Sequence, residues 1–328
     1  MSADCQLRPR QVLVSSSEPY DMDYTRLESL GDRVRKNVPL SRYTAARVGG
    51  PADVLIEANT LDELVISVQE LWASDAPFLV LGGGSNVLVS DMGMRGVVVI
   101  NRARAVHIEE TALPPSIWAE SGANFGVVAR QAALHGLAGL EWAAGIPGTI
   151  GGAVVGNAGA HGGDMAANLR VADILHRSRG KEQWSVERFA YQYRSSVLKL
   201  QNPPGKAPEI VILAARLLLE RSTPQMVQAK IDEFVVQRRR TQPPGASMGS
   251  MFKNPPGDFA GRLIEAAGLK GLRSGDAQIS SLHTNFFINL GRASAGEIYQ
   301  LIQLARQAVF EQFGVPLELE IEMVGDWD

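Results

Sequence analysis

Cysteine and clustered histidine are nearly absent from this sequence. The chain of 328 residues has one cysteine, Cys5, and five histidines that lie far apart. A lone cysteine excludes an intramolecular disulfide and favours a reducing compartment. The scattered histidines do not have the spacing of metal ligands, so we expect no metal site.

Long apolar runs are missing as well. The segment 210–219 is apolar but short and contains Arg216, and the uncharged segment 143–160 has too many glycines for a membrane-spanning helix. Residues 1–20 carry charges and prolines where a secretory signal needs an apolar core. We therefore expect a cytoplasmic protein that does not enter a membrane.

Neither sign of charge dominates. The 32 basic and 35 acidic side chains are interspersed and leave a net charge of −3 at pH 7. A nucleic-acid-binding surface would need a basic block, so nucleic acid is not an expected partner. An anionic ligand would instead be held by a few placed cations. The sequence leaves the oligomeric state open, with a monomer favoured.

Local signals predict a mixture of helices and strands. Ser294 with Glu297 is a capping box that begins a helix, and Thr223 before Pro224 marks another helix start. Ordered structure is expected from about Val38, after a flexible tail over residues 1–22. The expected helices cover 61–72, 124–137, 224–240, 258–267 and 295–313, and the expected strands cover 52–58, 77–81, 87–89, 97–100, 210–219 and 317–324.

Two glycine-rich segments are candidates for binding a diphosphate. The run 82–86, Gly-Gly-Gly-Ser-Asn, follows an apolar stretch, and its glycines let successive backbone amides converge on phosphate oxygens. The longer segment 144–162 is costly to order unless a ligand or close packing compensates. Plain turns are the alternative for both. Neither segment is a Rossmann fingerprint or a P-loop, because both of those sequences are absent.

A larger set of motifs occurs in a fixed order along residues 37–325. They are Arg47-Val-Gly-Gly-Pro51, Gly82-Gly-Gly-Ser-Asn86, Gly145-Ile-Pro-Gly-Thr-Ile-Gly-Gly152, Asn157-Ala-Gly159, Tyr193-Arg-Ser-Ser196, Gly249-Ser-Met-Phe-Lys-Asn-Pro255, the run 260–271, His283-Thr-Asn285 and Leu317-Glu-Leu-Glu320. Together they resemble the UDP-N-acetylenolpyruvoylglucosamine reductase family. Three positions depart from the family pattern: His161 replaces a tyrosine, Leu319 a proline, and Ala246 a residue of Pro-Ser-x-Gly-Ser. None of them removes a catalytic residue type.

The resemblance implies an α+β fold of the vanillyl-alcohol-oxidase type. We expect FAD-binding subdomains over 23–84 and 85–220, and a substrate-binding domain over 221–328 whose last strand returns toward the active site. FAD would be bound non-covalently, because Pro51 follows Gly49-Gly50 where related oxidases carry a tethering histidine. The residues implied in FAD binding are Arg47, Gly49, Gly82, Gly83, Gly84, Ser85, Asn86, Gly122, Ala123, Gly145, Ile146, Pro147, Gly148, Thr149, Gly151, Gly152, Ala153, Asn157, Ala158 and Gly159.

The resemblance also implies a two-stage reaction on a UDP-sugar. NADPH reduces FAD and leaves, and UDP-N-acetylglucosamine enolpyruvate is then reduced to UDP-N-acetylmuramate, a peptidoglycan precursor. Hydride addition places enolate-like charge on the substrate carboxylate, and Arg194 would stabilise that charge because a guanidinium stays protonated and presents a planar fork. Ser250 would donate the proton to the adjacent carbon. On composition alone, a surface ion pair for Arg194 and a turn position for Ser250 are favoured, and only the resemblance reverses this.

The third catalytic residue is implied to be Glu320, acting with Arg194. Spacing alone does not choose it, because Glu318, Glu320 and Glu322 share one face of an alternating strand. The implied substrate contacts are Tyr193, Arg238, Lys253, Asn254, His283 and Asn285. A buried core histidine is the alternative for His283.

Two other functions remain open at this point. One is an oxidase of small alcohols or sugars with the same fold, and the other is a flavin-binding scaffold without turnover. The segment 40–50 resembles the second type of the reductase family, which lacks a tyrosine-bearing lid over the substrate. No tyrosine occurs between Arg194 and Ser250, so that segment cannot supply such a lid. We expect an open diphosphate site.

Overall fold

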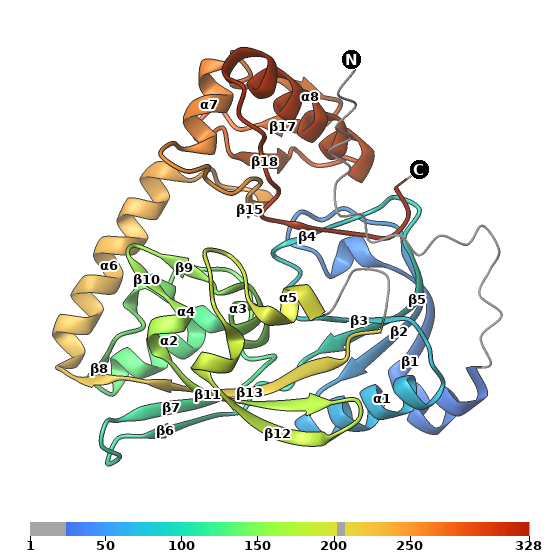
Figure 1. Ribbon diagram of the computed structural model, residues 1–328, viewed down its shortest axis with the longest axis vertical. Helices are drawn as coiled ribbons and strands as arrows, with labels where there is room; N and C mark the ends of the chain where they lie inside the picture. Colours follow the sequence, from blue (N-terminus) through green and yellow to red (C-terminus); the bar gives the residue numbers. More distant parts are fainter. Residues whose placement is uncertain (1–23, 202–206, 328) are drawn as a thin grey trace, which may run out of the picture.

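Three structural units follow one another along the chain (Figure 1). The computed structural model describes residues 24–201 and 207–327, and the tail expected over 1–22 lies outside them. The first two units are built on sheets of four and five strands. A long helix, α6, leads from the second unit to the third, which combines another four-stranded sheet with two helices.

The first unit is a mixed sheet with the strand order β1-β2-β5-β3. β1 runs antiparallel to β2, whereas β2, β5 and β3 run parallel to one another. Helix α1 begins where the Thr60 side chain accepts a hydrogen bond from the Glu63 amide. Ordered structure begins before the expected Val38, with a 3-10 helix. The bounds are η1 Tyr24–Arg33, β1 Val34–Pro39, η2 Leu40–Arg42, β2 Pro51–Ala58, α1 Leu61–Ala73, β3 Phe78–Leu81 and β5 Met94–Asn101.

Helix α1 lies between the first and second sheets. Its buried Leu64 and Val68 belong to one hydrophobic cluster with Val97 of the first sheet and Leu213 of the second. The Trp72 indole also donates a hydrogen bond of 2.8 Å to the Pro208 carbonyl. Burying each large apolar side chain stabilises the fold by roughly 1.5–3 kcal/mol, so α1 fixes the two sheets against each other.

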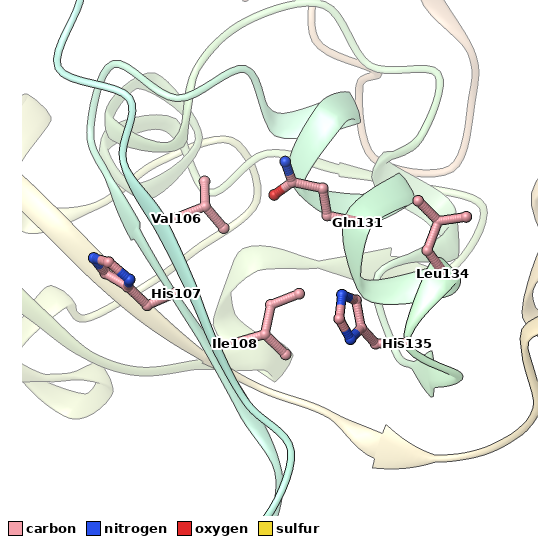
Figure 2. Close-up of a pocket in the computed structure, with 6 residues that line it drawn as sticks. All are labelled: Val106, His107, Ile108, Gln131, Leu134 and His135. Atoms are coloured by element: carbon pink, nitrogen blue, oxygen red, sulfur yellow. The ribbon is translucent and has the colours of Figure 1, made fainter.

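The second unit is an antiparallel sheet in the order β12-β11-β13-β7-β6. Its edge strand β6 and helix α2 border an open depression of about 470 Å³, lined by both apolar and polar side chains (Figure 2). The bounds are β6 Val106–Glu109, β7 Ser116–Glu120, α2 Phe125–Leu134, β8 Leu137–Ala138, η3 Glu141–Ala143, α3 Ile150–Gly156, β9 Gly159–Ala160, β10 Gly163–Asp164, α4 Met165–Asn168, β11 Leu169–His176, β12 Gly180–Ser185, η4 Val186–Phe189, α5 Val197–Gln201, β13 Ile210–Leu218 and β14 Glu220–Arg221.

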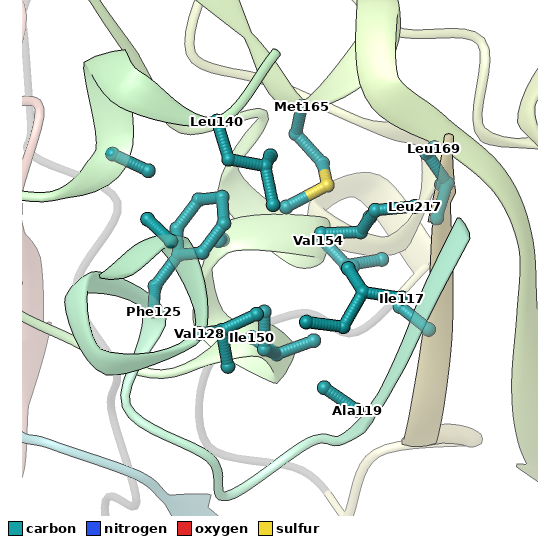
Figure 3. Close-up of a cluster of buried hydrophobic side chains, with 14 of the residues drawn as sticks. Ile117, Ala119, Phe125, Val128, Leu140, Ile150, Val154, Met165, Leu169 and Leu217 are labelled. Atoms are coloured by element: carbon teal, nitrogen blue, oxygen red, sulfur yellow. The ribbon is translucent and has the colours of Figure 1, made fainter. Parts of the chain in front are cut away.

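Helix α3 lies in the second glycine-rich segment, where the many glycines indicated a poor helix. Ile150 and Val154, four residues apart, are fully buried and pack with Phe125 and Ile117 in the core of the second unit (Figure 3). This packing outweighs the low helix propensity of glycine. Helix α2 likewise ends three residues before the expected position, because Gly136 turns the chain with φ 65° into strand β8.

The third unit begins after α6, whose proline at the first helical turn and Thr223 cap are as predicted. Its sheet has the order β15-β18-β17-β16. The capping box of Ser294 and Glu297 is present, and α8 ends at Gly314, which has φ 68°. Helix α7 starts two residues later than expected. The bounds are α6 Pro224–Thr241, β15 Ala246–Ser250, α7 Ala260–Ala266, β16 Arg273–Ser274, β17 Ala277–Ile279, β18 Phe286–Asn289 and α8 Ala295–Phe313.

The chain returns to the first unit after α8 (Figure 1). Strand β19, Glu322–Val324, pairs in parallel with β4, Val87–Val89. The strand expected over 317–324 is therefore shorter than predicted. Its first half instead bonds the segment after β15, through a bridge between Leu319 and Phe252. One extended segment thus changes partner midway and joins the third unit to the first.

Side-chain hydrogen bonds reinforce this junction. The carboxylate of Asp91 accepts from the amides of Ala295 and Gly296 at 2.8 Å each, at the start of α8. The side-chain amide of Asn289 donates to the Ala46 carbonyl at 2.9 Å. The third unit is therefore held on the first by polar contacts at the end of β18 and at the start of α8.

The sheet pairings bear on the expected domain boundaries. The boundary expected at residue 84 falls inside the first sheet, because β5 pairs with both β2 and β3. We propose that the first subdomain extends to Asn101, with β4 leaving it to pair with β19. The boundary expected at 220 lies at β14, just before α6.

Candidate active site

The two glycine-rich segments meet face to face. A Cβ added to Gly83 would lie 3.2 Å from the Gly148 Cα, and one added to Gly148 would lie 2.9 Å from the Ser85 hydroxyl. The Ser85 hydroxyl donates a hydrogen bond of 3.1 Å to the Pro147 carbonyl. Gly148 also has φ 127°, which L-residues rarely adopt. Glycine is thus required where the two loops approach each other.

This pair of loops offers unpaired backbone amides. Within residues 24–201 and 207–327, no hydrogen-bond acceptor is present for the amides of Gly83, Gly84 and Ser85, or for those of Gly148 and Thr149. Consecutive free amides beside glycine form a concave anion site, because no side chain shields them. The residues present therefore fit the diphosphate of FAD.

Valine at Gly83 or Gly148 is expected to abolish FAD retention while leaving the fold largely intact. The added side chain would push the two loops apart and, at Gly148, would strain the backbone. Gly156→Val is the matched control, because a Cβ at Gly156 meets nothing within 4 Å. Flavin absorbance after gel filtration, with circular dichroism for folding, measures the outcome. Full flavin content in both loop variants would show that the loops are structural turns.

Other residues implied in FAD binding support these loops through their own backbone bonds. The Gly151 amide donates to the Ser121 carbonyl at 2.8 Å, and the Ile150 amide donates to the Ala123 carbonyl at 3.0 Å. Gly122 leaves no room for a Cβ beside the Ala103 carbonyl, and Gly49 leaves none beside Val89. The start of α3 is therefore held against residues 121–123, and Gly49 allows close approach to β4.

Asn157 bonds to backbone groups of the protein through its side chain. Its backbone is left-handed, with φ 47°, and its side chain is buried. The side-chain oxygen accepts from the Ala166 amide at 3.0 Å, and the nitrogen donates to the Gln192 carbonyl at 3.1 Å. Asn157 therefore ties the second glycine-rich segment to the loop that precedes Arg194.

Arg194 and Glu320, far apart in sequence, form an ion pair. Arg194 Nε lies 2.9 Å from Glu320 Oε1, and both side chains are mostly buried. The Nε–H is not aligned with that oxygen, so the contact is an ion pair without hydrogen-bond geometry. Arg194 also has φ 55°, a conformation that costs a non-glycine residue about 1–3 kcal/mol. Strain of this kind gathers at functional sites, where the surrounding structure enforces it.

Burial separates the three glutamates that spacing alone could not. The side chain of Glu320 is 17% exposed, whereas those of Glu318 and Glu322 are 76% and 47% exposed. Burial raises the pKa of the Glu320 carboxyl above its usual range, and the charges of Arg194, Lys199 and Lys253 partly oppose this shift. Perturbed, buried carboxyls paired with a cation are typical of active sites.

Ser250 lies next to this pair through the backbone. It ends strand β15, opposite Phe286, and follows Gly249, which has φ 78°. The adjacent Met251 carbonyl accepts a hydrogen bond of 2.9 Å from the Glu320 amide. Within the part of the chain that the structure describes, the half-buried Ser250 hydroxyl has no hydrogen-bond partner. It is thus free to contact a ligand.

Among the described residues, three of the implied substrate contacts have side chains that do not bond to the protein backbone. Tyr193 is 55% exposed, and its ring centroid lies 5.7 Å from the Arg194 Cζ. Lys253 lies 3.4 Å from Glu318, on the surface. Arg238 packs on Gly145 of the second glycine-rich segment, and its burial lowers the pKa of its guanidinium. These three remain candidates for binding.

Asn254 and Asn285 are instead occupied by backbone groups. The Asn254 side-chain oxygen accepts from the Ala260 amide at 3.1 Å, close to the start of α7. Asn285 is buried, and its side chain bonds both the amide and the carbonyl of Phe252, at 2.9 and 2.8 Å. Both asparagines therefore shape the loop that presents Lys253.

His283 is half-buried, and its ring is bonded and packed within the protein. Its Nδ1 accepts from the Asn285 amide at 3.3 Å, its ring packs edge-on against Phe286, and burial lowers its pKa. The unfolded chain should take up a proton near pH 6.5, which the folded ring resists. Folding stability should therefore fall as pH falls below about 6.5. Between pH 7 and pH 5, His283→Gln should lose less melting temperature than the parent protein. The difference between the two proteins at pH 8, where the histidine is neutral, measures the effect of the substitution on packing. Equal losses in the two proteins would contradict this.

Lys199 was not singled out by sequence reasoning. It lies on α5, five residues after Arg194, with Nζ 3.2 Å from the Glu322 carboxylate. The sequence signal for Lys199 was its position shortly after Arg194.

None of the predicted site residues lines the depression between β6 and α2 (Figure 2), so that surface is separate from this site.

The described ranges, 24–201 and 207–327, also bear on membrane insertion and on metal binding. No helix in them combines the length and apolar character needed to cross a membrane. No group of three or more histidine, cysteine, aspartate or glutamate side chains in them has the arrangement of a metal site.

Comparison with known proteins gives one consistent family. The family model of the UDP-N-acetylenolpyruvoylglucosamine reductase C-terminal domain matches residues 240–324, and that of the FAD binding domain matches residues 52–182. The chain is 45% identical to the reductase of Chloroflexus aggregans over 90% of this chain and 99% of that protein. It is 43% identical to the reductase of Rubrobacter xylanophilus over 92% and 98% of the two chains.

A solved structure agrees with these relatives. The crystal structure of UDP-N-acetylenolpyruvylglucosamine reductase from Thermus caldophilus matches with a TM-score of 0.73 at 38% identity, over 89% of this chain and 99% of that one. These matches confirm the expected α+β fold of the FAD-binding type. The chain belongs to the UDP-N-acetylenolpyruvoylglucosamine reductase family and is an FAD-dependent oxidoreductase of peptidoglycan precursor synthesis.

Proposed function

We propose that the chain takes reducing equivalents from NADPH and reduces UDP-N-acetylglucosamine enolpyruvate to UDP-N-acetylmuramate at the site formed by Arg194, Glu320 and Ser250. The observation that carries this proposal is the buried Arg194–Glu320 pair beside the free Ser250 hydroxyl. The pair stands where the FAD-binding units meet the third unit.

The first glycine loop and Gly148 with Thr149 would hold the FAD diphosphate, through the free amides described above. When bound, FAD supplies the hydride-transfer chemistry. The protein must then orient the enolpyruvyl group and stabilise the charge that develops on it. Pro51 follows Gly49-Gly50, so we propose that FAD is held without a covalent tether.

Arg194 would bind the substrate carboxylate where enolate charge develops. Its guanidinium is positioned before the reaction by a strained backbone and by Glu320, so little reorganisation is needed as charge grows. Ser250 would then deliver a proton to the neighbouring carbon. A serine hydroxyl is a weak acid, and the positive charge of Lys253, three residues later, would help it to donate.

The remaining proposals concern partners. Arg238, Lys253 and Tyr193 are the side chains proposed to contact the UDP-sugar, and Lys253 would give up its contact with the exposed Glu318 to do so. Within 24–201 and 207–327, no tyrosine lies between Arg194 and Ser250, which supports an open diphosphate site without a tyrosine lid. The enzyme is proposed to act in the cytoplasm, where UDP-sugars and NADPH are available, and to work as a monomer.

The purified protein tests this function directly. It should be yellow and should oxidise NADPH at a sustained rate only when the enolpyruvyl UDP-sugar is present. Steady oxygen consumption without that substrate would favour an oxidase of the same fold. A colourless protein after gentle purification would contradict the cofactor assignment.

A further inference from the structure

We infer that Asn86 and Asn157 are positioning residues that hold the two members of the Arg194–Glu320 pair, rather than contacts to the cofactor. This inference rests on the proposed function, in which that pair stabilises the developing charge. The two asparagines belong to the two glycine-rich segments. Each directs its side chain to the backbone beside one member of the pair.

Asn86 holds the segment that carries Glu320 at two points. Its side-chain nitrogen donates to the Glu320 carbonyl at 3.2 Å, and its own carbonyl accepts from the Glu322 amide at 2.9 Å. The Glu320 amide is held from the other direction by Met251, at 2.9 Å. Glu320 is therefore fixed through its backbone between the first glycine loop and the residue after Ser250.

Asn157 does the same for Arg194 from the second segment. Its side-chain nitrogen bonds the Gln192 carbonyl, and Gln192 forms a two-bond bridge with Ser195, so the turn containing Arg194 is closed. The left-handed backbone of Arg194 needs such support.

Backbone support matters here because the pair does not hold itself. The Arg194 Nε–H is not aligned with the Glu320 carboxylate, so within residues 24–201 and 207–327 no directional hydrogen bond fixes the carboxylate. Shifts of about 1 Å in a catalytic group slow reactions by up to roughly 100-fold. The asparagines thereby couple the loops that hold the diphosphate to the geometry of the pair.

The experiment separates positioning from cofactor binding. Asn86→Asp keeps the shape but places an acceptor oxygen against the Glu320 carbonyl. We expect FAD affinity and flavin reduction by NADPH within about twofold of the parent, and reoxidation by the enolpyruvyl substrate slowed by roughly 10–100-fold. Asn157→Gly, which tolerates the left-handed backbone, should behave alike. Glu311→Gln is the control, because Glu311 is exposed on α8 and bonds to Gln307, four residues earlier. This variant should change neither step.

Glu320→Gln calibrates the result. In that background, Asn86→Asp should slow reoxidation little further, because residues that act as a unit are not additive. Two outcomes would overturn this inference and leave the proposed function standing. One is a loss of FAD affinity in Asn86→Asp. The other is reoxidation of Asn86→Asp at the parent rate while Glu320→Gln is slow. Parent-rate reoxidation in Glu320→Gln would overturn the proposed role of Glu320, and this inference with it.

Discussion

Ser250→Ala is expected to separate the two halves of the catalytic cycle. Flavin content and flavin reduction by NADPH should stay near normal, because that step needs no proton on a substrate carbon. Reoxidation by the enolpyruvyl substrate should slow by roughly 10²–10⁴-fold, the range for loss of a general acid. The Ser250 hydroxyl has no partner within the described part of the chain, so its removal should leave no unpaired group and little loss of stability.

Stopped-flow flavin absorbance follows both steps in one sample. Ser250→Cys provides the internal comparison, since a thiol can still donate a proton and should retain more activity than alanine. If the alanine variant is reoxidised at the parent rate, Ser250 is a turn residue at the end of β15 and the proton comes from another group.

Arg194→Lys is expected to lose about 10²–10³-fold in the same reoxidation step, the usual cost of removing one charge-stabilising donor. Lysine keeps the positive charge but has no group at the position of Nε, which lies 2.9 Å from Glu320. It also cannot present two donors to a carboxylate. Arginine and lysine are equally strained by the left-handed backbone at position 194. The substitution should therefore change the position of the positive charge more than the stability of the fold.

Arg188→Lys is the control for the arginine change. Arg188 lies on η4, 4.2 Å from the Trp184 ring centroid and 3.8 Å from Glu182, and makes no contact with the proposed site. Its lysine variant should be reoxidised at the parent rate. Single-turnover rates at saturating substrate distinguish slower chemistry from weaker binding. Unchanged turnover in Arg194→Lys would show that a point charge is enough.

Local sequence signals predicted the elements whose ends are set by a few neighbouring residues. The Ser294–Glu297 capping box and the Thr223-Pro224 start are both present, because such caps satisfy amides within one turn. Helix α3 was missed because its stability comes from tertiary packing of Ile150 and Val154, which glycine content hides. The strands of the second sheet outside β13 were also missed, since their pairing depends on partners far along the chain.

The residues of the site could be predicted from the sequence, but the role of each one could not. Only the resemblance distinguished Glu320 from Glu318 and Glu322. The burial of the Glu320 side chain depends on its contact with Arg194, which is distant in sequence. Asn86 was implied in FAD binding, and in the structure its side-chain nitrogen donates to the Glu320 carbonyl. Such a contact joins residues more than two hundred positions apart and leaves no local pattern in the sequence.

The parallel pairing of β4 with β19 sets an order for biosynthesis. The strand Val87–Val89 pairs with Glu322–Val324, which is synthesised much later. Contacts between residues so far apart in sequence form late, because closing a long loop is entropically unfavourable. Both glycine-rich segments emerge from the ribosome in the first half of the chain. A nascent chain can thus fold its first two sheets while the carboxylate of Glu320 has yet to be made. Competence for the second half-reaction arrives only with residues 317–324, together with the strand that closes the junction.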